Sequence, residues 1–161
     1  MLARRSAATL ALALGAATAA GAQTATQTVT FQVNAINVVS FTGSPSLTIT
    51  TAVAGNAPTS VTDASATWAV TTNQTGAKIS AALSANMPAG LTLSVNLAAP
   101  TGGPTSNGYK ALSTASADLV DAVTQLAQGP LGVTYKLDAT PAAGVVSSST
   151  RIVTYTISGG T

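Results

Sequence analysis

The sequence predicts an all-β protein, an immunoglobulin-like antiparallel β-sandwich of about 7–9 short strands. Three observations support this prediction. Apolar and polar residues alternate with a period of two in many short segments, and Gly- and Pro-containing turns separate these segments. No long segment after residue 22 shows a helical period, and the chain is rich in Val and Thr, which favour strands.

Residues 1–22 have the pattern of a secretory signal peptide. Arg4-Arg5 forms a basic region, Leu10–Ala19 an apolar region and Ala20-Gly21-Ala22 a small-residue cleavage site. The apolar run is too short for a stable membrane anchor. We therefore expect export to a secreted or cell-surface location. The mature chain, residues 23–161, is expected to form a single β-sandwich domain without a membrane span.

The charge of the chain argues against nucleic-acid binding. The chain has six basic and four acidic residues, but Arg4 and Arg5 belong to the predicted signal peptide. A mature chain would keep four scattered cations and four aspartates, and a nucleic-acid binder needs clustered Lys and Arg. A neutral surface rich in hydroxyl groups also gives little electrostatic repulsion against self-association.

The longest alternating segment, Gln27–Phe41, begins the predicted mature chain. Its odd positions are mostly apolar and its even positions mostly polar. This period predicts a half-buried strand longer than usual, or two strands joined by a bend. Asn37 occupies an inward position, which predicts a bend near Ala35–Asn37. The second half, Ile36–Phe41, is expected in the domain's own sheet. The first half, Thr28–Val33, could pair with a strand of the same molecule or with a strand of a neighbouring molecule.

The other strands are predicted in chain order by the same alternation. They are expected at residues 47–50, 65–72, 78–83, 91–97, 109–112, 133–138 and 151–158, and residues 118–128 fit either a helical turn or a strand. Asn73–Gly76 has the composition of a hairpin connection, and Gly129-Pro130 is expected to interrupt the chain. Ala98–Gly108 is expected to be an exposed loop. Trp68, the only tryptophan, is expected in the core.

Residue types that support catalysis are sparse. The chain has no His, no Cys and no Glu, and no Ser-x-x-Lys spacing follows residue 22. We therefore predict a non-enzymatic protein with no catalytic, cofactor-binding or metal-binding residues. Calcium at Asp118 and Asp121 is a weaker alternative, because calcium takes six to eight oxygen ligands. A covalent cross-link from Lys78, Lys110 or Lys136 is another weaker alternative.

Two further features are candidates for surface contacts. Tyr109 follows a Gly-rich loop and is the aromatic residue outside the predicted apolar strand faces, so it is a candidate contact for cell wall or glycan. Asn73-Gln74-Thr75 matches a glycosylation sequon, but its position favours a simple turn.

The end of the chain carries a resemblance to known proteins. Leu137–Gly144, which reads Leu-Asp-Ala-Thr-Pro-Ala-Ala-Gly, and Arg151–Ile157, which reads Arg-Ile-Val-Thr-Tyr-Thr-Ile, resemble the last hairpin of exported bacterial surface sandwiches. These include spore-coat-U-type pilin subunits and WxL-type cell-wall-binding domains. Trp68-Ala69-Val70 is similar to the Trp-x-Leu motif, with Val in place of Leu. The resemblance implies a cell-surface, non-enzymatic role.

The sequence therefore predicts a structural protein that self-assembles into an extracellular fibre, pilus-like filament or surface coat. In β-strand addition, an extended segment of one subunit pairs with an open sheet edge of the next. Val29, Phe31 and Val33 are the predicted donor side chains. The alternative is a monomeric module that binds cell wall or glycan through Ala98–Tyr109.

Overall fold

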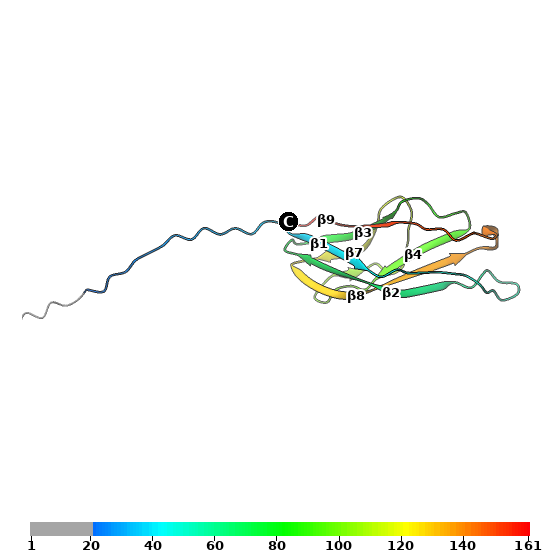
Figure 1. Cartoon of the computed structure of the whole chain (residues 1–161), viewed down its shortest axis with the longest axis horizontal. Helices are drawn as coiled ribbons and strands as arrows, with labels where there is room; N and C mark the ends of the chain where they lie inside the picture. The colour runs from blue at the N-terminus through cyan, green and yellow to red at the C-terminus, as the bar shows by residue number, and fades with distance from the viewer. Residues whose placement is uncertain (1–20) are drawn as a thin grey trace, which may run out of the picture. The chain divides into compact units, whose positions relative to one another are not determined.

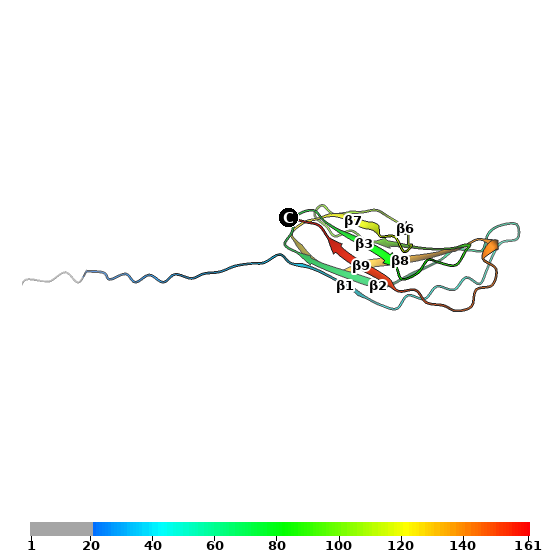
Figure 2. The same cartoon turned by 90° about the horizontal axis from the view of Figure 1, so that it is seen from above.

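The computed structural model describes residues 21–161, which contain nine strands in two antiparallel sheets (Figures 1 and 2). The chain divides into two units, residues 1–32 and 33–161, and all of these strands lie in the second unit. Residues 1–20, which hold most of the predicted signal peptide, lie outside the described residues. Within residues 21–161, no helix is long and apolar enough to cross a membrane.

One sheet has five strands and the other has four. The five-stranded sheet has the order β1 (Asn37–Thr42), β2 (Val61–Thr72), β8 (Leu126–Ala139), β4 (Leu91–Leu97) and β6 (Lys110–Ala111). The four-stranded sheet has the order β5 (Thr105–Ser106), β7 (Ala117–Val123), β3 (Ala77–Leu83) and β9 (Val153–Ser158). A short 3-10 helix, Pro141–Ala143, follows β8.

The core lies between the two sheets. It consists mainly of the apolar residues that alternate with polar residues along the strands. Its largest fully buried side chains are Trp68, Val70, Ile79, Val95, Leu97, Leu119, Val120, Val123 and Val133. The predicted all-β sandwich of two antiparallel sheets is confirmed, as is the core position of Trp68. Residues 118–128, which fitted a helical turn or a strand, form most of β7, a two-residue connection and the start of β8.

The connection Asn73–Gly76, here called the crossover loop, is not a hairpin. It joins β2 in the five-stranded sheet to β3 in the four-stranded sheet, so the two strands do not pair. The same holds for the predicted last hairpin, because β8 pairs with β2 and β4 while β9 pairs with β3. Turn residues indicate where the chain reverses, but pairing depends on which sheet the next strand joins.

Two further predictions from turn and period signals were wrong. Gly129-Pro130 does not interrupt β8; it lies at a register shift opposite Ala69, where a bulge accepts a residue without a backbone N–H. A Cβ on Gly129 would lie 2.4 Å from the Cβ of Ala69, so glycine permits this close approach. Residues 47–50 form no strand, although Leu47 and Ile49 are half-buried at alternate positions.

Candidate functional site

The predicted donor residues lie in a segment that belongs to no strand. We call residues 27–33 the N-terminal segment; β1 begins later, at Asn37, and no strand is assigned in residues 21–36. The side chains of Val29, Phe31 and Val33 are 73%, 90% and 77% exposed. Exposed apolar side chains in a row are typical of a surface that binds a partner. In an extended conformation, all three would point to one side.

The strands β1 and β9 each form an edge of the sandwich. Within the described part of the chain, β1 pairs only with β2, and β9 pairs only with β3. Figures 1 and 2 show β9, coloured red, beside β1. The rings of Phe41 in β1 and Tyr155 in β9 stack with their centroids 3.6 Å apart, and Phe41 also stacks on Trp68 at 6.0 Å.

The inward side chains of β9 are only partly covered. In β9 the burial alternates strictly: Val153, Tyr155 and Ile157 are half-buried, and the residues between them are exposed. Their neighbours in β3, Ile79 and Ala81, are fully buried. This difference in burial arises because β3 has a neighbouring strand on each side, whereas β9 has a neighbouring strand on one side only.

The backbone of β9 also points outward at these positions. Ser84 N–H donates to Ile152 O at 2.9 Å, whereas Leu83 N–H donates to Ser113 O at 2.7 Å and not to its register partner in β9. Bonded and non-bonded pairs alternate along an antiparallel ladder. The backbone groups of Val153, Tyr155 and Ile157 therefore point away from β3. This edge offers both backbone hydrogen bonds and apolar side chains to an added strand.

Two tyrosines anchor β9 to the core. The hydroxyl groups of Tyr135 in β8 and Tyr155 in β9 are hydrogen-bonded at 2.6 Å. Burial raises the pKa of Tyr155 well above its usual value of 10.0, and the hydrogen bond to Tyr135 raises it further. Burial also raises the pKa of Tyr135, while its hydrogen bond to Tyr155 opposes this. Both hydroxyl groups are therefore protonated when the domain is folded at neutral pH.

This pair predicts a loss of stability at alkaline pH. Above about pH 10 the unfolded chain releases the tyrosine protons while the folded protein retains them, so stability that is complete below pH 10 falls as the pH rises. Each tyrosine whose pKa is raised by folding lowers the free energy of unfolding by up to about 1.4 kcal/mol per pH unit in this range. We expect Tyr155→Phe to make the slope shallower, and to cost about 1 kcal/mol near neutral pH because Tyr135 loses its partner.

The measurement is urea unfolding at a series of pH values. Tyr109→Phe is the matched control, because Tyr109 is 46% exposed and takes no part in the pair. An alkaline slope in Tyr155→Phe as steep as in the unmodified protein would contradict the prediction.

Two lysines form ion pairs with aspartates at the surface. Lys78 Nζ lies 2.9 Å from Asp118 Oδ2 and 3.7 Å from Asp121 Oδ1, and the hydrogen bond to Asp118 raises the pKa of Lys78. Lys136 Nζ lies 2.9 Å from Asp138 Oδ1. Exposed pairs of this kind contribute little to stability. Among residues 21–161, no three acidic, His or Cys side chains gather as a metal site would require.

Tyr109 lies on the other side of the sandwich from the β9 edge. It precedes β6, and β6 and β5 are the sheet edges opposite β1 and β9. The ring contacts found in residues 21–161 join Phe41 with Trp68 and Tyr155, and Tyr109 is in neither.

The fold and these edges define an all-β sandwich with an exposed alternating segment before β1 and an open sheet edge at β9. No protein-family model, no curated protein and no solved structure matches this chain.

Proposed function

We propose that this protein is an exported, non-enzymatic structural subunit that assembles with copies of itself into an extracellular fibre, pilus-like filament or surface coat. The sandwich is then of the immunoglobulin-like kind, and its β9 edge accepts the N-terminal segment of a neighbouring copy. The observation that carries the proposal is the strict alternation of half-buried apolar residues on β9, at an edge where no second strand of residues 21–161 pairs.

The two partners of this contact have matching patterns. The segment offers three apolar side chains two residues apart, Val29, Phe31 and Val33. The edge offers three at the same spacing: Val153, Tyr155 and Ile157. The edge of β1 fits less well, because it offers only Val39 and Phe41 before the strand ends at Thr42.

The energy of such a contact predicts assembly that depends on concentration. Burying a Val or Phe side chain contributes about 1.5–3 kcal/mol, and each ladder hydrogen bond adds about 1 kcal/mol. Association costs about 4–15 kcal/mol in lost freedom of motion. Since the two sums are of similar size, we expect assembly to strengthen with protein concentration and with the number of ladder bonds formed.

Sedimentation and electron microscopy of residues 23–161 test the proposal. We expect particles of many subunits, whose mean size grows with protein concentration. A variant without residues 23–33 keeps every described strand and should sediment as a monomer. Monodisperse monomers of the longer chain at every concentration, unaffected by this deletion, would overturn the proposal.

A further inference from the structure

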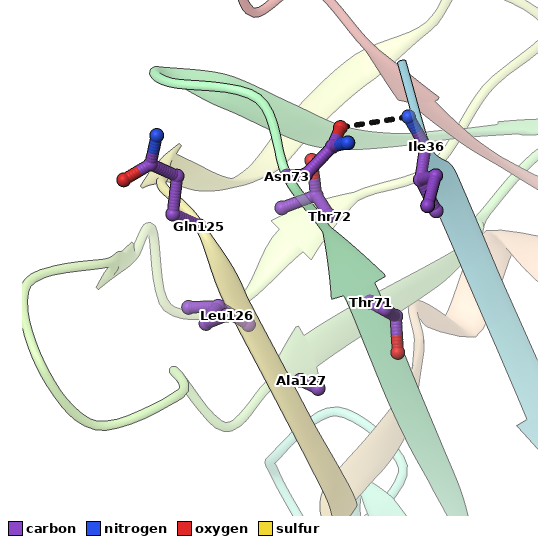
Figure 3. A pocket seen from close by; sticks show the side chains of 7 residues that line it. All are labelled: Ile36, Thr71, Thr72, Asn73, Gln125, Leu126 and Ala127. Carbon is purple, nitrogen blue, oxygen red and sulfur yellow. Dashed lines mark hydrogen bonds between the residues drawn. The ribbon is translucent and has the colours of Figure 1, made fainter. Parts of the chain in front are cut away.

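The residues just before β1 are hydrogen-bonded to Asn73 of the crossover loop. Asn73 Oδ1 accepts a hydrogen bond from Ile36 N–H at 2.7 Å (Figure 3). Asn73 Nδ2 donates a hydrogen bond to Asn34 O at 2.7 Å. The backbone N–H of Asn73 also donates to Ile36 O at 3.2 Å. Gln74 Nε2 donates to Asn73 Oδ1 at 2.8 Å, which fixes the orientation of the amide. Asn73 thus pairs with residues 34–36 as a neighbouring strand would.

The crossover loop also holds the end of the chain. Thr75 and Thr161 exchange two backbone hydrogen bonds, of 3.0 and 3.2 Å. β1 therefore begins, and β9 ends, at the same end of the sandwich. For the N-terminal segment to pair with β9 of its own chain, the chain would have to reverse direction immediately before β1.

The bonds of Asn73 oppose this reversal. Residues 23–42 contain no Gly and no Pro, so Asn34 is the residue before Ile36 best suited to a tight turn. Its carbonyl is the group that Asn73 Nδ2 holds. A turn over Asn34–Ile36 would break this bond and the bond to Ile36 N–H.

We infer that Asn73 determines the specificity of assembly: it holds residues 34–36 extended, so that the N-terminal segment reaches a second copy of this chain and not its own β9 edge. This inference rests on the proposed function. Asn73 is a positioning residue, because it acts on the segment through the backbone of residues 34–36.

Cross-linking tests the inference in the chain of residues 23–161, which has no native cysteine. Thr30→Cys and Thr156→Cys place one thiol on the segment and one on the exposed side of β9, and a short bismaleimide joins them. With Asn73 present we expect links between molecules, seen as a ladder on a denaturing gel. Asn73→Ala loses both side-chain hydrogen bonds to residues 34–36, so the ratio of links within one molecule to links between molecules should rise roughly 10- to 30-fold.

Thr75→Ala is the matched control, because it changes an exposed side chain of the same loop and keeps the Asn73 bonds. Asn73→Asp is a second test: it keeps an acceptor for Ile36 N–H but loses the donor to Asn34 O, so its ratio should also rise. A ladder with an unchanged ratio in both Asn73 variants overturns the inference alone. If the two-cysteine chain with Asn73 unchanged links mainly within one molecule, that result also overturns the inference. Absence of any link between molecules in every variant overturns the proposed function, and the inference with it.

Discussion

Phe31→Asp is expected to abolish assembly of the mature chain. Phe31 is the largest apolar side chain of the N-terminal segment and is 90% exposed in the free chain. At the β9 edge its ring would cover the half-buried residues around Tyr155, whereas a carboxylate there would have to lose its water without a cationic partner. We expect sedimentation to show monomers at concentrations at which the unmodified chain forms large particles.

Thr30→Asp provides the control for charge. It adds the same carboxylate one residue away, and in an extended segment it points to the opposite side. We expect Thr30→Asp to assemble nearly as well as the unmodified chain. Equal loss of assembly in both variants would show that charge on the segment, and not the apolar face of Phe31, decides the result.

Trp68→Ala is expected to have the largest effect on folding. Trp68 is 1% exposed, stacks on Phe41 and donates its indole N–H to Ala98 O at 3.2 Å. Truncating a buried Trp to Ala costs about 3–5 kcal/mol, because transfer energy is lost and a cavity is left. Total stabilities of natural domains are about 5–15 kcal/mol, so this loss is a large share of the total and should move the urea midpoint well below that of the unmodified protein.

Urea unfolding followed by circular dichroism measures this loss, since the variant has no tryptophan fluorescence. Trp68→Phe is the graded control: it keeps an aromatic ring beside Phe41 but loses the N–H donor, and should cost clearly less than the Ala variant. A loss below about 1 kcal/mol in Trp68→Ala would contradict the position of this residue in the core.

Local alternation predicted most strands and their inward faces. The strand predicted at residues 91–97 has the same bounds as β4, and the strand predicted at residues 78–83 differs from β3 by one residue. The bend predicted near Ala35–Asn37, within the long alternating segment Gln27–Phe41, lies close to the start of β1. The position of a strand and the side to which its residues point are local properties. Alternating apolar and polar residues indicate them directly, because successive side chains of a strand point to opposite faces.

Pairing between distant strands could not be predicted in this way. The crossover loop and a hairpin use the same turn residues, and only the sheet that β3 joins distinguishes them. The alternation predicted that Tyr155 points inward, but not that β9 is an edge. Likewise, Asn73 was recognised as a turn residue, whereas its bonds to Asn34 and Ile36 span almost forty positions of sequence.

The proposed pairing of the N-terminal segment with the β9 edge has a consequence for any polymer that it forms. Because donor and acceptor are different surfaces of the same subunit, the contact is heterologous, and repeating it without ring closure gives an open filament with polarity. One terminus of such a filament carries an unfilled β9 and the other an unused segment. A subunit without residues 23–33 accepts a neighbour but donates nothing, so it caps one terminus and leaves growth at the other unaffected.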